Sequence, residues 1–317
     1  MNWDIQLNEE VDMLRETVRQ FAEKRIAPIA EDVDRENEFP QHLWKELGYL
    51  GLLGMTVSEE YGGSEMSYLA HLVAVEEISR ASASVGLSYG AHSNLCVNQL
   101  QINGSPAQKE KYLPKLCSGE HVGALAMSEP GAGSDANAGK TKAVLSNEKK
   151  HYKISGQKMW ISNAAYADIF IVFARIEDDK NITAFIVPKD SDNGIKLGEE
   201  EKKLGLNSSS TRQVFFTETK VPVENLLGER NGGFKIAMKG LDGGRVNIAA
   251  CSLGGARAAL ENSLTYSAER KQFGKSIDQF QVTQFKLADM ATELEASRLM
   301  VLRAATSLDS KDPHATK

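Results

Sequence analysis

The sequence predicts an α+β protein of several domains, in which helices come first, a β-rich region follows and helices return. Apolar residues recur at three- and four-residue steps in both outer parts of the chain, which is the period of an α-helix. The middle part instead has short β-branched and aromatic runs divided by turn formers, which is typical of strands. We therefore expect a helical N-terminal domain over residues 1–120, an antiparallel β middle domain over 121–228 and a C-terminal helical domain over 229–317.

The composition supports a folded protein and excludes several classes. The chain has 317 residues, of which 41% are hydrophobic and 25% charged, values that argue against a disordered, collagen-like or coiled-coil protein. The formal net charge of −6 gives no positive field for nucleic acid. No apolar run reaches membrane-spanning length, and the N-terminus lacks a basic, apolar leader, so we expect neither membrane insertion nor export.

The three cysteines are widely spaced and form no CxxC pair, which favours a reducing compartment over a disulfide framework. We expect a cytoplasmic protein, or one of the mitochondrial matrix if a transit peptide has been removed. The histidines show no metal-ligand spacing, so we expect no metal site.

The first helix is marked by apolar residues on one face: Val11, Leu14, Val18 and Phe21. We expect it to end at Pro28, because proline interrupts a helix. A second helix should begin after Ser105, where Pro106 suits the first turn and Gln108 completes a capping box.

The strands of the middle region are expected at three runs in particular: 151–154, 169–173 and 214–216. Residues 147–150 have the composition of a hairpin turn. Because almost no helical period interrupts this stretch, a compact antiparallel barrel or sandwich is favoured over a doubly wound nucleotide fold, which alternates strand and helix.

The helical period returns from Phe234 to about Arg270 and again from about Gln279 to Leu308. The first of these helices contains an unusual set of glycines: Gly240, Gly243, Gly244, Gly254 and Gly255. Each interior glycine costs about 1 kcal/mol relative to alanine. Close packing of another helix and close approach of a ligand explain such glycines equally well, and Asp242 beside Arg245 is equally consistent with a solvated ion pair.

Residues 131–136 match the GxGxxA dinucleotide pattern, but Pro130 precedes them and a strand follows, which is the wrong context. Residues 139–141 resemble the end of a phosphate loop but lack its first glycine, because Ser134 stands there. A glycine- and hydroxyl-rich loop suited to close contact with a polar ligand remains. No GxSxG elbow is present, so the chemistry must come from a cofactor or from carboxylates.

Together the motifs resemble the acyl-CoA dehydrogenase family. Residues Leu125–Asp135 look like its first signature, and three further landmarks follow in the family's order: Met159–Asn163, Leu241–Arg245 and Glu269–Gly274. The resemblance covers essentially the whole chain, including Glu60–Gly63. It implies the helix–sheet–helix organisation expected above.

The resemblance also implies FAD as the cofactor. One group of residues would line the isoalloxazine ring: Leu125, Ala126, Met127 and Ser128. A second would lie near the reactive nitrogen of the flavin: Trp160, Ile161 and Ser162. A third would reach the FAD of a neighbouring subunit: Arg270, Gln272, Phe273 and Gln281. Contacts to the thioester and CoA would come from a fourth group: Ser134, Asp242, Gly243, Gly244 and Arg245.

By resemblance, the reaction removes two hydrogens across the α and β carbons of an acyl-CoA and gives the trans-2-enoyl-CoA. A carboxylate takes the α proton, the flavin accepts a hydride, and the electrons pass to an electron-transfer flavoprotein. The family implies a homotetramer or dimer acting in fatty acid or branched-chain amino acid degradation. Residues 89–135 look most like the isovaleryl type, whereas the sequence from 202 onward looks more like isobutyryl and short-chain types, so a short or branched acyl chain is expected.

The sequence departs from the family at the catalytic base. Most members place this glutamate late in the C-terminal domain, beyond the position of Lys317, and the isovaleryl type places it where this chain has Gly244. We therefore expect no catalytic base among these residues, an incomplete C-terminal bundle, and unpartnered apolar seams at Leu287, Met290, Leu294, Leu299 and Leu302. A catalytically silent FAD- or acyl-CoA-binding or assembly subunit is the alternative function. An oxidase that passes electrons to oxygen also stays open.

Overall fold

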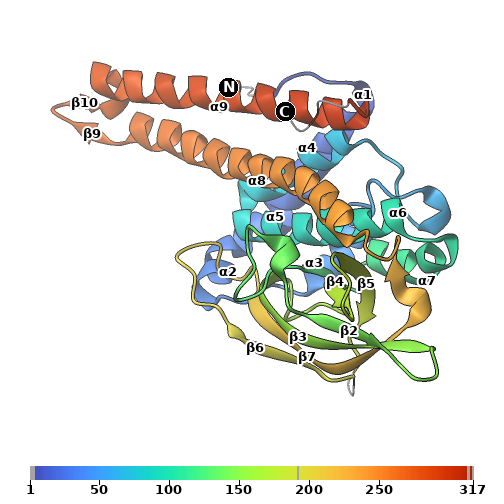
Figure 1. Cartoon of the computed structure of the whole chain (residues 1–317). Helices are drawn as coiled ribbons and strands as arrows, with labels where there is room; N and C mark the ends of the chain where they lie inside the picture. The colour runs from blue at the N-terminus through green and yellow to red at the C-terminus, as the bar shows by residue number, and fades with distance from the viewer. Residues whose placement is uncertain (1–3, 191–192, 313–314, 316–317) are drawn as a thin grey trace. The chain divides into compact units, whose positions relative to one another are not determined.

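A computed structural model of the chain describes residues 4–190, 193–312 and 315. The chain forms two compact units, which are described separately (Figure 1). The first, called the helical unit, comprises Met1–Asp32, Tyr68–Leu87 and Val246–Lys317. The second, called the sheet unit, comprises Val33–Ser67 and Ser88–Arg245.

One eight-stranded sheet organises the sheet unit. Its strands are β1 (Gly123–Ala126), β2 (Lys142–Leu145), β3 (His151–Ser162), β4 (Ile169–Ile176), β5 (Ile182–Pro188), β6 (Ile195–Glu200), β7 (Thr211–Pro222) and β8 (Leu226–Leu227). The strand order is β6-β7-β3-β2-β4-β5-β8, and β1 pairs with β4. The expected β region is confirmed, and the 147–150 turn joins the antiparallel strands β2 and β3. The sheet is mixed, however, because β1 and β2 both pair with β4 in parallel.

Strands β4 and β5 lie in the centre of the unit and are buried on both faces, which explains their almost uninterrupted apolar sequence. On one face, Ile171 and Ile186 belong to a core shared with Leu113 and other helical residues. On the other face, Phe170 and Phe185 belong to a second core, formed mainly by side chains of the other strands of the sheet. The two faces together fix the register of β4 and so the position of β1 beside it.

The remaining helices of the sheet unit and its border are α2 (Ala30–Glu36), α3 (His42–Tyr49), α6 (Gln99–Asn103), α7 (Pro106–Cys117) and a π-helical segment (Ala91–Asn98). Short 3₁₀ or π turns occur at Ala22–Ile26, Ala27–Ile29, Glu59–Tyr61, Ala136–Ala138, Val223–Asn225 and Ile277–Gln279. The capping box expected at α7 is confirmed, because the Gln108 N–H donates to the Ser105 hydroxyl and the Ser105 N–H to the Gln108 side chain.

The helical unit contains α1 (Glu9–Phe21), α4 (Tyr68–Ala81), α5 (Ala83–Gly90), the later part of α8 (Gly233–Glu269), the hairpin strands β9 (Lys271–Gln272) and β10 (Lys275–Ser276), and α9 (Gln281–Asp309). The expectation that Pro28 ends the first helix is wrong. The α-helical bonding of α1 stops at Phe21, and π and 3₁₀ turns carry the helical path past Pro28 into α2. Proline has no N–H group to donate. At the start of a helical turn this causes no loss, because the first N–H groups of a turn have no partner within the helix.

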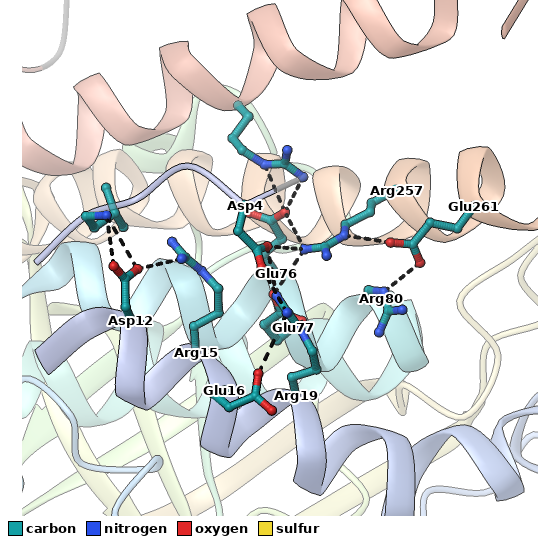
Figure 2. A network of polar contacts seen from close by, with 12 residues as sticks. Asp4, Asp12, Arg15, Glu16, Arg19, Glu76, Glu77, Arg80, Arg257 and Glu261 are labelled. Atoms are coloured by element: carbon teal, nitrogen blue, oxygen red, sulfur yellow. Dashed lines mark hydrogen bonds and ion pairs between the residues drawn. The ribbon is translucent and has the colours of Figure 1, made fainter. Parts of the chain in front are cut away.

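A network of ion pairs joins helices α1, α4, α8 and α9 of the helical unit and the segment before α1 (Figure 2). Its centre is Glu77 of α4, which accepts hydrogen bonds from Arg19 of α1 at 2.7 and 3.1 Å and from Arg257 of α8 at 3.1 Å. Asp4 contacts both arginines, and Glu261 accepts from Arg257 at 2.9 Å. These ion pairs add to apolar packing, because Val11 and Val18 of α1 are buried as well.

Two further contacts tie α4 to the C-terminal helices. The Asp309 carboxylate at the end of α9 accepts hydrogen bonds from the backbone N–H groups of Tyr68 (2.7 Å) and Leu69 (3.0 Å), and so caps the N-terminus of α4. At Gly254 of α8, an added Cβ would lie 2.4 Å from the Glu76 carbonyl oxygen. Glycine at 254 therefore lets α8 lie directly against the backbone of α4.

Helices α8 and α9 share a small apolar core around Leu253, Leu260 and Leu294. Beside it lies a groove of about 490 Å³, lined among others by Ala256 and Met290. The expectation of unpartnered seams holds in part: Leu294 is buried in the α8–α9 core, whereas Leu299 and Met290 are exposed. Across the described residues, no helix is both long and apolar enough to cross a bilayer.

Candidate functional site

The start of β1 is held by a buried, uncharged histidine. The Gly123 N–H donates to Nδ1 of His92 (2.9 Å), and Nε2 of His92 lies 3.1 Å from the carbonyl oxygen of Leu116. One ring nitrogen accepts and the other donates, which fixes the neutral tautomer. Burial lowers the pKa of His92 to about 4. The strand that carries Leu125 and Ala126 is therefore anchored by hydrogen bonds that do not depend on charge near neutral pH.

The turn after β1 lies against the end of β3. The Met159 N–H donates to the Ser128 carbonyl oxygen (2.8 Å). In β3 the pairing register with β7 shifts between Lys158 and Ile161, and Trp160 within that interval has a φ of 57°. Such a bulge redirects a side chain, and the Trp160 side chain is 58% exposed. The structure thus brings together two of the three predicted flavin-binding groups.

The buried ion pair between Lys158 and Glu129 holds the turn after β1 in place. The ammonium of Lys158 lies 2.8 Å from Oε1 of Glu129 and donates to the Met127 carbonyl oxygen at 3.0 Å. Glu129 also accepts from the backbone N–H groups of Lys140 (2.6 Å) and Thr141 (3.0 Å). Lys158 is 1% exposed and Glu129 is 7% exposed. One lysine and one glutamate therefore connect the turn, strand β3 and the start of β2.

The protonation of this pair follows from its partners. Burial alone would raise the pKa of Glu129, but the neighbouring Lys158 and the backbone donors lower it overall. For Lys158, burial lowers the pKa, and the Glu129 carboxylate opposes that change. The sequence motifs did not identify Lys158 as a residue of the site. A signal was present, because Lys158 has the same strand parity as the inward-facing Tyr152 and Ile154, and a lysine there needs a buried acidic partner.

The glycine-rich loop that follows the turn is open. Nothing lies within 4 Å of a Cβ placed at Gly131 or Gly133, and Ser134 is exposed. A hollow of about 280 Å³ adjoins the loop and is lined by Glu129, Pro130, Gly131, Ala138, Lys140, Thr141, Gly156 and Gln157. The backbone of this loop is therefore open at Gly131 and Gly133, and the contact with a ligand stays a prediction.

Close packing accounts for two glycines of α8 in the sheet unit. A Cβ at Gly240 would lie 3.0 Å from the Gln99 side chain, and one at Gly244 would lie 3.2 Å from Cδ2 of Leu95. These contacts favour the packing explanation at both positions. At Gly244 the neighbour is the tip of a flexible side chain, so a larger residue is tolerated there.

The charged pair predicted on α8 is formed. Asp242 accepts a hydrogen bond from Arg245 at 2.7 Å, and the Arg245 side chain is 71% exposed. An exposed pair three residues apart contributes little to stability. Arg245 therefore has a guanidinium that can turn to an anionic ligand at small cost.

The third predicted group lies on the helical unit, around the β9–β10 hairpin. Phe273 and Gly274 form its two-residue turn, with φ values of 52° and 80°, as a type I′ turn requires. Phe273 is 94% exposed, and Arg270, Gln272 and Gln281 are exposed as well. These side chains are therefore accessible to solvent at the hairpin, at the end of α8 and at the start of α9. No cluster of three or more His, Cys, Asp or Glu able to hold a metal ion occurs in the part of the chain that is described.

Three family descriptions match the chain: "Acyl-CoA dehydrogenase, N-terminal domain" over residues 8–120, "Acyl-CoA dehydrogenase, middle domain" over 124–219, and "Acyl-CoA dehydrogenase, C-terminal domain" over 231–317. Among curated relatives, mitochondrial isovaleryl-CoA dehydrogenase of Pongo abelii is 48% identical over 312 residues, which cover 96% of this chain and 73% of the relative. The short-chain-specific acyl-CoA dehydrogenase of Clostridium acetobutylicum is 42% identical, covering 95% and 80%.

Solved structures of high similarity also come from acyl-CoA dehydrogenases. Butyryl-CoA dehydrogenase of Megasphaera elsdenii has a TM-score of 0.94 and 39% identity, covering 98% of this chain and 82% of that one. An acyl-CoA dehydrogenase of Bacillus anthracis complexed with FAD has a TM-score of 0.92 and 38% identity, covering 98% and 54%. A chain from a structure described as an electron transferring flavoprotein of Acidaminococcus fermentans has a TM-score of 0.95 and 40% identity, covering 98% and 82%.

Proposed function

Since the chain belongs to the acyl-CoA dehydrogenase family and is an FAD-dependent oxidoreductase acting on acyl-CoA, we propose that it takes part in the α,β-dehydrogenation of a short- or branched-chain acyl-CoA. The trans-2-enoyl-CoA is the product, and an electron-transfer flavoprotein is the electron acceptor. The observation that carries this proposal is the hydrogen bond between the turn at Ser128 and Met159, which is followed in the bulge of β3 by the exposed Trp160.

The residues at this junction fit an isoalloxazine ring. Leu125 and Met127 are half-buried and offer apolar surface, and Trp160 offers an exposed ring. Ser128 and Ser162 supply hydroxyl groups, and the backbone around them supplies N–H donors. Bound FAD supplies a two-electron acceptor there. The chain's own residues orient that acceptor and exclude water from one of its edges.

The acyl-CoA contacts are proposed for the open glycine loop at Ser134 and for α8 at Asp242, Gly243, Gly244 and Arg245. An accessible backbone at Gly131 and Gly133 allows close approach of a polar chain. The exposed guanidinium of Arg245 suits an anionic or carbonyl group of the ligand. Arg270, Gln272, Phe273 and Gln281 are proposed to contact the FAD of a second copy of this chain in a homo-oligomer.

One of the two positions at which the family carries its base glutamate corresponds to residue 244, which is glycine in this chain. Asp242 is two residues away and so faces another side of the helix. The glycine at 244 is the observation behind the second candidate function, an FAD- or acyl-CoA-binding subunit without dehydrogenase activity.

An anaerobic titration separates the two functions. The 317-residue chain is loaded with FAD and mixed with isovaleryl-, isobutyryl- or butyryl-CoA, and the visible absorbance of the flavin is followed. Bleaching of the flavin supports the proposed dehydrogenation, whereas a perturbed spectrum without bleaching supports the binding subunit. The variant Gly244→Glu should bleach the flavin, because Leu95 can yield to the new side chain.

Gly255→Glu is the matched control, because that glycine lies on the same helix with nothing within 4 Å of its Cβ position. It should behave as the wild-type chain does. Rapid bleaching by the wild-type chain would overturn the second candidate function. Binding without bleaching in every variant would favour the binding subunit.

A further inference from the structure

The buried position of Lys158 is poorly explained by stability. Its ammonium and the Glu129 carboxylate are both removed from water, at 1% and 7% exposure. The desolvation of two such charges can exceed their attraction, and well-packed apolar residues in their place are often neutral or stabilising. A second explanation for this lysine comes from the other contact of its ammonium group, which is made with a backbone carbonyl oxygen.

That contact is made with the peptide bond between Met127 and Ser128. Lys158 donates to the Met127 carbonyl oxygen at 3.0 Å. The peptide bonds of the described chain are all trans, so the carbonyl of Met127 and the N–H of Ser128 point in opposite directions. The cation thus lies at one end of a peptide dipole whose other end, the Ser128 N–H, is directed away from it.

The Ser128 N–H has no partner among the hydrogen bonds of the described residues. The groups on either side of this N–H are nevertheless held by hydrogen bonds. The Ser128 carbonyl oxygen accepts from the Met159 N–H at 2.8 Å, and Glu129 is held by the N–H groups of Lys140 and Thr141. The donor is therefore oriented by bonds on both sides and kept available for a ligand.

A cation bonded to a carbonyl oxygen polarises the whole peptide unit and makes its N–H a stronger donor, because hydrogen bonds in a chain reinforce one another at low dielectric. Hydrogen bonds assisted by a charge are roughly twice as strong as neutral ones. A stronger donor favours the state of the ligand that carries more negative charge.

We propose that Lys158 is a positioning residue that acts through the Met127–Ser128 peptide to favour the reduced, more negative state of the bound flavin. Glu129 keeps the ammonium on that carbonyl and aligns the turn. This inference rests on the proposed placement of the flavin ring at the turn, and on no step of acyl-CoA chemistry.

The test is the reduction potential of bound FAD, measured by anaerobic reductive titration against a reference dye without acyl-CoA. In Lys158→Met, the equilibrium constant for flavin reduction should fall about tenfold, equivalent to ~30 mV for two electrons. The double variant Glu129→Gln/Lys158→Met, which leaves no unpaired buried charge, should show the same shift and guards against misfolding of the single variant. Lys153→Met removes an exposed lysine of the same strand and should change nothing.

A purely structural role of Lys158 predicts a different result. The dissociation constant for FAD would rise in both variants, but oxidised and reduced flavin would lose affinity equally, and the potential would stay at the wild-type value. That outcome would overturn the proposal. Because the titration uses a dye and no acyl-CoA, it decides the role of Lys158 even if the chain proves to have no dehydrogenase activity.

Discussion

Replacing Glu77 by glutamine should destabilise the helical unit strongly. Glu77 is 2% exposed and accepts three hydrogen bonds from Arg19 and Arg257 at 2.7–3.1 Å. Glutamine has the same shape but no charge, and its amide group would place donors against the guanidinium donors. Breaking one partner of a buried ion pair costs about 3–5 kcal/mol. The unfolding equilibrium should therefore shift by roughly two to three and a half orders of magnitude.

The assay is equilibrium unfolding in urea followed by far-ultraviolet circular dichroism, with amide hydrogen exchange of α4 to report the helical unit alone. Glu218→Gln is the matched control, because it makes the same chemical change in an exposed pair with Lys153. Exposed pairs contribute about 0–1 kcal/mol. If Glu77→Gln cost no more than Glu218→Gln, the view that this network stabilises α4 would be refuted.

The same network predicts a dependence on pH. Burial would raise the pKa of Asp4 and of Glu261, but the neighbouring arginines lower both overall. A carboxyl with a lowered pKa contributes stability above its ordinary pKa, which is 3.8 for Asp4 and 4.5 for Glu261, and loses that contribution as the pH falls below it. The wild-type chain should lose stability more steeply than the double variant Asp4→Asn/Glu261→Gln below about pH 4.5, because that variant has neither carboxylate.

Other predictions concern histidine and the glycines of α8. Burial lowers the pKa of His92 to about 4 from 6.5, so the folded state should lose up to about 3 kcal/mol as the pH falls between these values, because only the unfolded imidazole takes up a proton. His92→Gln should flatten that part of the stability curve, and an unchanged slope would contradict the assignment. Gly254→Ala should destabilise by about 1–3 kcal/mol, because its Cβ would meet the backbone of α4. Gly255→Ala, with open space, should stabilise by up to about 1 kcal/mol, and thermal melting distinguishes the two.

Local signals in the sequence predicted much of the fold. The Ser105 cap, the β runs of the middle region and the two long C-terminal helices are confirmed, because each depends on residues close together in the chain. The parallel pairing of β1 with β4 was not foreseen, because pairing partners far apart in sequence leave no local pattern. Pro28 misled for a related reason, since a proline in the first turn of a new segment is compatible with a continued helical path.

The sequence predicted only those site residues that belong to a recognised motif. The turn at Met127–Ser128 and the bulge at Trp160 are brought together as the resemblance implied, while the roles of these residues and the three domain ranges stay predictions. Lys158 lies directly before a recognised motif, yet its role depends on Glu129, which is 29 residues away. The ion pairs around Glu77 join residues up to 253 positions apart, as in Asp4–Arg257, and could not be inferred from spacing.

The cap that Asp309 provides has a consequence for synthesis. Helix α4 is complete after residue 81, but the carboxylate that satisfies its first N–H groups is translated 228 residues later. At ribosomal rates of about 5–20 residues per second, the nascent helix waits roughly 10 to 45 s for its cap. The sheet unit can condense on the ribosome in that interval, whereas the helical unit closes only after residue 309 has been made. Chaperones that bind exposed helices should therefore engage its early segments.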